Sequence, residues 1–224
     1  MKDLLKYITN NIIESKSSTA ILVVDFQNDF VDGSLAVSGA KELVLPIEEF
    51  IIRLWYTANN ITYIFTKDVH PDDHCSFKEN GGLWPQHCVK NTHGAEFAFT
   101  TEFIDEFLPK LKNTMVLFEK GQDPDREEYS PFNLEVKTHA NLENRHLKLG
   151  QINDIETFYV FGLATDYCVK NTAMDLVAAG FKVIVISDLC KGVDPETTKA
   201  AIEEMRAADR KSTRLNSSHG LLSR

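Results

Sequence analysis

The chain has 224 residues, of which 43% are hydrophobic and 25% charged; this is the composition of an ordinary soluble protein with room for a sizeable core. With 24 basic and 33 acidic residues the net charge is −9, which argues against a nucleic-acid-binding surface. No apolar run reaches the roughly 18 residues of a membrane-spanning helix, the N-terminus lacks the pattern of a signal peptide, and four scattered cysteines predict a reduced, cytoplasmic setting.

Hydrophobic patterns predict strands that alternate with helices. In chain order they predict a helix at 3–14, a strand at 19–26, helix 41–59, strand 61–68, helix 100–111, strand 113–121, helix 140–151, strand 157–162, helix 166–179, strand 181–188 and helix 194–208. The strands are uniformly apolar, as parallel strands buried on both faces are. We therefore expect an α/β fold with three layers, α/β/α, around a mostly parallel central sheet.

The C-terminal residues 209–224 differ in kind from the rest of the chain. They read DRKSTRLNSSHGLLSR and have no helical or strand periodicity. The part DRKSTRLNSSH is similar to the translation of a common sequencing adapter. We interpret 1–19 as an N-terminal extension with a weak helical pattern, 20–208 as the single domain and 209–224 as a non-native or disordered tail. The alternative is an ordinary basic tail.

Polar side chains follow the ends of four predicted strands. In an open parallel sheet, ligands bind beyond the carboxyl ends of the strands, which lie at one edge. We therefore expect one shared site at that edge, whatever the strand order. The side chains that would meet there are Asp25 after the first strand, Asp68, His70 and His74 after the second, Glu119 and Lys120 after the third, and Cys168 after the fourth.

Cys168 stands where a predicted strand passes into a predicted helix, in the stretch GLATDYCVKNTAMD. One interpretation is a small residue that packs well. The other is a nucleophile, because N–H groups at a helix start favour a thiolate and lower the pKa of the thiol. Lys120 would add to that effect, and Asp25 could take the thiol proton and return it to a leaving group. The three residues at one edge together favour catalysis.

The segments KDVHPDDHCSF (67–77) and LWPQHCV (83–89) carry a candidate metal site. Asp68 and His70 can face the same side of an extended segment, and His87 can close the site from a separate loop. A carboxylate with two imidazoles leaves positions open, as at catalytic or substrate-binding metal sites. His74 is either a further ligand or a supporting residue. The alternative is a polar loop whose histidines bond to the backbone.

Two aromatic residues accompany these candidates. Phe30 follows Asp25 closely in the chain, and Trp84 precedes His87. Two aromatic faces suit the binding of a flat ring. Ordinary core packing is the alternative for both residues.

Five stretches together resemble the nicotinamidases of the isochorismatase-like cysteine hydrolases. They follow the family's order and cover about residues 20–208. The pair DVH and WPQHC is the part that points to nicotinamidases within the broader family. The stretches are VVDFQNDFVDGSL (23–35), TKDVHPDDHCSF (66–77), LWPQHCVKNTHGAEF (83–97), FEKGQDPDREEYSPF (118–132) and VFGLATDYCVKNTAMD (160–175).

The resemblance implies a role for each candidate. The family's catalytic triad falls on Asp25, Lys120 and Cys168. Its metal ligands fall on Asp68, His70 and His87, with zinc as the expected divalent ion and iron or manganese as alternatives. Its aromatic clamp falls on Phe30 and Trp84. Its oxyanion hole falls on the backbone N–H groups of Ala164 and Cys168, with a cis peptide bond before Ala164. Family members usually end with a further strand, and here its place is taken by 209–224.

The activity that follows from the resemblance is hydrolysis of nicotinamide to nicotinate and ammonia in NAD salvage, through a thioester on Cys168. The expected partner is this small substrate, without nucleic acid or membrane, in a monomer or homo-oligomer. One alternative is a related amidase that acts on a ureido or carbamoyl substrate. Another is a metal-binding homologue without activity. The metal cluster argues against the first, and the complete set of Asp25, Lys120 and Cys168 argues against the second.

Overall fold

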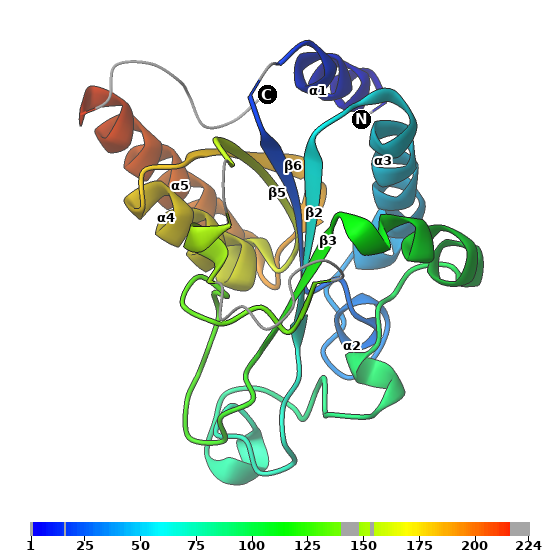
Figure 1. Cartoon of the computed structure of the whole chain (residues 1–224). Helices are drawn as coiled ribbons and strands as arrows, with labels where there is room; N and C mark the ends of the chain where they lie inside the picture. The colour runs from blue at the N-terminus through cyan, green and yellow to red at the C-terminus, as the bar shows by residue number, and fades with distance from the viewer. Residues whose placement is uncertain (1, 16, 140–147, 153–154, 216–224) are drawn as a thin grey trace.

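The computed structural model describes residues 2–15, 17–139, 148–152 and 155–215 (Figure 1). Within them, a twisted sheet of six strands lies in the order β4-β3-β2-β1-β5-β6. All neighbouring strands pair in parallel except β3 and β4, which pair antiparallel. The expected α/β architecture with a mostly parallel sheet is therefore confirmed.

The strands follow the apolar runs of the sequence. Their bounds are β1 Thr19–Val24, β2 Ile61–Asp68, β3 Met115–Lys120, β4 Thr138–His139, β5 Thr157–Leu163 and β6 Lys182–Lys191. β4 was not expected, because two residues leave no periodic pattern. β6 runs further than the predicted 181–188, since its pairing with β5 resumes at Cys190 after a register shift.

Helices cover both faces of the sheet. In Figure 1, α1 (Lys2–Glu14) and α3 (Val44–Thr57) lie on one side, and α4 (Lys170–Ala178) and α5 (Pro195–Leu215) lie on the other. α5 begins as the sequence predicts, with Pro195 first and the carboxylate of Asp194 accepting hydrogen bonds from the N–H groups of Glu196 and Thr197. Among the described residues, no helix is both long and apolar enough to cross a membrane.

Two of the predicted helices are not found as continuous α-helices in the described residues. The helix expected at 100–111 is a π-helical turn, η4 (Phe103–Phe107), followed by a 3-10 turn, η5 (Leu108–Asn113); Pro109 has no N–H to continue a regular α-helix. The helix expected at 140–151 falls mostly on 140–147, outside the described residues.

The C-terminal part also differs from expectation. α5 continues past Ala208, where we expected the domain to end, to Leu215. Within the described residues no strand follows α5, and 216–224 lie outside them.

The strand register builds the edge at which the candidate residues meet. Val24 of β1 pairs with Gly162 of β5, and Asp68 of β2 pairs with Lys120 of β3. Gly162 has φ 122°, and a Cβ there would lie 2.2 Å from the carbonyl oxygen of Val24. Only glycine fits so close an approach. The carboxyl ends of β1, β2, β3 and β5 thus reach the same edge.

Candidate active site

Three strand ends bring Asp25, Lys120 and Cys168 into contact. Asp25 directly follows β1, Lys120 is the last residue of β3, and Cys168 lies in the π-helical turn η7 (Thr165–Val169) after β5. Lys120 Nζ lies 2.8 Å from Asp25 Oδ2 and donates to Cys168 Sγ at 3.3 Å. Lys120 has no exposed surface, and Cys168 keeps 5%. The ammonium therefore stands between the carboxylate and the thiol, away from bulk water.

Asp25 is held in a fixed orientation at the end of β1. Its backbone has φ 42°, and its Oδ1 accepts a 2.6 Å hydrogen bond from the hydroxyl of Thr66. Burial raises the pKa of the Asp25 carboxyl, although Lys120 opposes the rise. A carboxylate whose pKa is raised is a better proton acceptor near neutral pH than an ordinary aspartate.

The protonation of Cys168 differs from our expectation. We predicted a lowered thiol pKa from the helix start and Lys120. Burial instead raises the pKa of Cys168 well above its ordinary value, and the favourable charge of Lys120 does not outweigh it. Sequence alone does not show how deeply a thiol is buried, and burial disfavours the charged form. The resting thiol is therefore protonated, and it needs a base at the moment of reaction.

A second cluster adjoins these three residues. Asp68, His70 and His87 offer one ligand atom each, all within 4.8 Å of one another. His70 Nδ1 donates to the carbonyl of Gly121 at 2.9 Å, and His87 Nδ1 donates to that of Pro85 at 2.8 Å. With Nδ1 donating in each ring, Nε2 is the atom left to bind a metal ion, as in metal-binding histidines. Burial lowers the pKa of His70 but Asp68 raises it overall, so its Nε2 would give up a proton on binding the ion.

The charges of this cluster also suit a cation. Burial lowers the pKa of His87, which keeps its imidazole neutral. Burial alone would raise the pKa of Asp68, but Lys120 and His70 lower it overall, so its carboxylate is ionised. Asp68 contacts Lys120 through Oδ1, which leaves Oδ2 on the side of the histidines. His70 Nε2 and Asp68 Oδ2 lie 3.7 Å apart, which fits two ligands that each lie about 2.0–2.2 Å from one zinc ion.

His74 lies behind this cluster. Its ring stands 4.1 Å from that of His70, between ring centres. Its Nε2 donates to the carbonyl of Arg126 at 3.1 Å, and its Nδ1 accepts from the N–H of Ser76 at 3.1 Å. Because both ring nitrogens have protein partners, this geometry favours the supporting role for His74 over the ligand role.

Two residues that sequence reasoning missed hold the metal-type cluster in place. The fully buried amide of Gln27 accepts from the N–H of Asp68 at 2.8 Å and donates to its carbonyl at 2.7 Å. Asp29 accepts from the N–H of Cys88, next to His87, at 2.7 Å. The stretch QNDF carried the signal, but a side chain that bonds to a distant backbone leaves no periodic trace.

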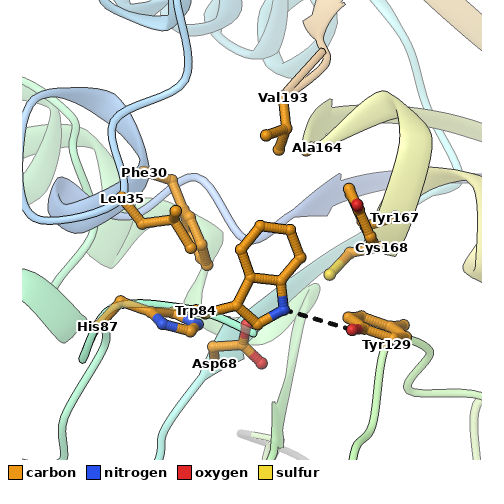
Figure 2. A pocket seen from close by; sticks show the side chains of 10 residues that line it. All are labelled: Phe30, Leu35, Asp68, Trp84, His87, Tyr129, Ala164, Tyr167, Cys168 and Val193. Carbon is orange, nitrogen blue, oxygen red and sulfur yellow. Dashed lines mark hydrogen bonds between the residues drawn. The ribbon is translucent and has the colours of Figure 1, made fainter. Parts of the chain in front are cut away.

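A small cavity of about 30 Å³ opens onto both clusters. Phe30 and Trp84 line it as expected, together with Leu35, Tyr129, Tyr167 and Val193, which the sequence analysis did not single out. Figure 2 shows the indole of Trp84 in this cavity, with Nε1 directed at the hydroxyl of Tyr129 at 3.4 Å. Its ring meets that of Tyr167 edge to face, at 4.9 Å between ring centres. The walls are mostly aromatic and aliphatic, which suits a flat apolar ring.

The turn that carries Cys168 also presents Ala164 to the cavity. The peptide bond Leu163–Ala164 is cis, as the resemblance implied. The carbonyl of Ala164 accepts hydrogen bonds from the N–H groups of Tyr167 and Val169, both at 3.1 Å. Ala164 and Cys168 both line the cavity.

Four free thiols, Cys75, Cys88, Cys168 and Cys190, account for the cysteines of the chain.

The sequence of the chain matches the Isochorismatase domain over residues 19–214. The chain belongs to the isochorismatase family. Within it, the nicotinamidase/pyrazinamidase of Mycobacterium tuberculosis is 36% identical, over 84% of this chain and 95% of that protein. The fold is similar to pyrazinamidase of Pyrococcus horikoshii in complex with zinc, with TM-score 0.70 and 34% identity over 85% of this chain and 96% of that one.

A further similar structure carries a ligand. PnC1 from L. infantum, in complex with nicotinate, has TM-score 0.69 and 26% identity over 93% of this chain and 94% of that one. These relatives are matched over nearly their whole length. The family's fold and its overall architecture are therefore present in this chain.

Proposed function

We propose that the chain is a nicotinamidase, which hydrolyses nicotinamide to nicotinate and ammonia with Cys168 as nucleophile. The observation that carries the proposal is the contact of Lys120 with Asp25, Asp68 and Cys168 at one wall of an aromatic cavity. A proton acceptor, a fixed positive charge and a thiol are the parts that a covalent amide hydrolysis needs. Nicotinamidases and a nicotinate complex among the relatives support this choice of amide.

A divalent metal ion fits the chemistry of the donor set. Asp68, His70 and His87 would hold it, with two imidazole Nε2 atoms and one carboxylate oxygen. When bound, the ion supplies a Lewis acid that anchors the nitrogen of a pyridine ring. The zinc complex of the Pyrococcus horikoshii relative makes zinc our first choice. His74 then supports the site from behind without coordinating the ion.

The substrate would lie with its amide at Cys168 and its ring between aromatic walls. Phe30 and Trp84 are the proposed clamp, since both line the cavity. A flat heteroaromatic ring gains favourable packing against such faces. Holding the amide carbon near the thiol lowers the entropic part of the barrier.

The reaction proceeds in two stages. As Cys168 approaches the amide carbon, Asp25 takes the thiol proton and the sulfur forms the new bond. The oxyanion is held by the backbone N–H groups of Ala164 and Cys168. In comparable sites, each such donor stabilises the transition state by roughly 3–4 kcal/mol. Asp25 returns the proton to the amide nitrogen, the C–N bond breaks, and ammonia leaves. Water then attacks the thioester, which releases nicotinate and restores the thiol.

Lys120 keeps this proton transfer local. Burial would lower the pKa of its ammonium, but Asp25 and Asp68 raise it well above its ordinary value. Lys120 therefore stays charged and stabilises the thiolate as it forms. Such an enzyme would act in NAD salvage in the cytoplasm, where its free thiols stay reduced.

The test is a paired assay of ammonia and nicotinate with purified, zinc-loaded protein. We expect the two products in equal amounts from nicotinamide, and loss of turnover after chelation that returns on adding zinc. Ammonia from a carbamoyl substrate and none from nicotinamide would reject the proposal in favour of the related amidases.

A further inference from the structure

The cavity has one wall that comes from a segment outside the matched motifs. Val193 lies between β6 and α5, lines the cavity, and keeps 38% of its surface exposed. Figure 2 shows Val193 together with Ala164 at one end of the cavity, with Asp68 and His87 at the other. The sheet explains this neighbourhood, because Leu163 of β5 pairs with Lys191 of β6. An apolar side chain thus faces the space beside the amide-binding turn.

A buried carboxylate holds this segment in position. Asp166 lies in η7, two residues before Cys168, and is 4% exposed. Its Oδ1 accepts from the N–H of Val193 at 3.0 Å, and its Oδ2 accepts from the N–H of Asp194 at 3.2 Å and from the hydroxyl of Thr197. The turn that presents the thiol and the wall that presents Val193 are therefore joined by one side chain.

The space beside this link is filled. A Cβ at Gly192 would lie 1.7 Å from Thr198 Oγ1 and 3.1 Å from Asp166 Oδ1. The backbone before Val193 is packed against the start of α5, so it has little freedom to retreat. The carboxylate of Asp166 bonds this segment to the turn, and together with the packing of Gly192 it holds Val193 in position.

We propose that Val193 determines which substituents on the ring of the amide substrate are accepted, and that Asp166 is the positioning residue that sets this limit. The inference rests on the proposed function for the identity of the amide. In a closely packed apolar pocket, one methyl group more or less changes substrate preference by about tenfold or more. The wall formed by Val193 would therefore reject a methyl group on the ring carbon that faces it.

The experiment compares nicotinamide with nicotinamides methylated on different ring carbons. Val193→Ala is expected to raise kcat/KM for at least one methylated amide, relative to nicotinamide, by about tenfold, and Val193→Leu to lower it. Asp166→Asn places an N–H₂ group opposite at least one of the donors that now bond to the carboxylate, the N–H groups of Val193 and Asp194 and the hydroxyl of Thr197. It should therefore also raise kcat/KM for the methylated amide relative to nicotinamide. Because Asp166 acts through Val193, the effect of Asp166→Asn should largely disappear in the double variant with Val193→Ala.

A matched control separates positioning from stability. Thr197→Val removes one hydrogen bond to Asp166 but leaves the bond to Val193, so it should lower the melting temperature and keep the substrate preference. The same ligand series is titrated by tryptophan fluorescence with Cys168→Ala protein, in which no turnover is needed. If Val193→Ala shifts the binding of the methylated amides as predicted but wild-type protein does not hydrolyse nicotinamide, the proposed function fails and this inference stands. Unchanged preference in Val193→Ala, or additive effects in the double variant, would overturn it.

Discussion

Replacing Lys120 with Met tests how the buried charges are balanced. The substitution keeps the length of the side chain but removes the positive charge that contacts both Asp25 and Asp68. At 2.8 Å and an effective dielectric constant of about 20, the attraction between Lys120 and Asp25 alone is about 6 kcal/mol. Part of this offsets desolvation, and breaking a buried pair from one side costs about 3–5 kcal/mol. We expect Lys120→Met to lose that much of the free energy of unfolding.

The assay is urea unfolding of metal-free protein, followed by tryptophan fluorescence. Lys67→Met is the matched control, because Lys67 of the neighbouring strand pairs at 3.2 Å with Glu96, whose side chain is 61% exposed. That pair should contribute at most about 1 kcal/mol. Equal losses in the two variants would refute the reasoning.

The pH dependence of the loss gives a second check. Without Lys120, burial raises the pKa of the remaining carboxyls above the unfolded value of about 4. A carboxyl with a raised pKa in the folded state destabilises the protein above that pKa, and the cost fades as the pH falls toward the unfolded value. The loss in Lys120→Met should therefore be largest near neutral pH and shrink in acid. A loss that grew as the pH fell would contradict this sign.

Three further predictions concern the metal site and the chain end. Gln27→Glu removes both donors that hold the backbone at Asp68 and Ala95, and should weaken zinc binding by about 10–100-fold in a competition titration with a chelator; an unchanged affinity would refute the positioning role. His87→Ala removes a proposed ligand and should lower the zinc affinity by about 100-fold or more in the same titration. His93→Ala, at an exposed histidine, should leave the affinity unchanged. A chain that ends at Ala208 should keep the turnover of nicotinamide, measured as ammonia; its loss would show that residues 209–224 support the site.

The edge that holds the candidate site could be predicted from the sequence, because it depends on where apolar runs end. Asp25, Lys120 and Cys168 each follow such a run, and parallel strands bring their carboxyl ends together. The same logic placed Asp68 and Lys120 at one edge, and in the structure the two residues pair directly in the sheet. Local patterns sufficed here, because each residue is positioned by its own strand.

The supporting residues could not be predicted in this way. Gln27 reaches the backbone of Asp68, and Asp166 reaches that of Val193, over long separations in sequence. Such contacts depend on how loops fold back, and they impose no spacing on the residues between. The raised pKa of Cys168 was missed for a related reason, since the extent of burial depends on the whole fold.

The most direct test of the account is to find where the substrate becomes attached during turnover. Zinc-loaded protein is mixed with nicotinamide, quenched in acid, digested and examined by mass spectrometry. The account predicts a nicotinoyl group on the peptide that contains Cys168, with neither this adduct nor ammonia from Cys168→Ala protein. A nicotinoyl group on another residue, or undiminished turnover by Cys168→Ala, would contradict it.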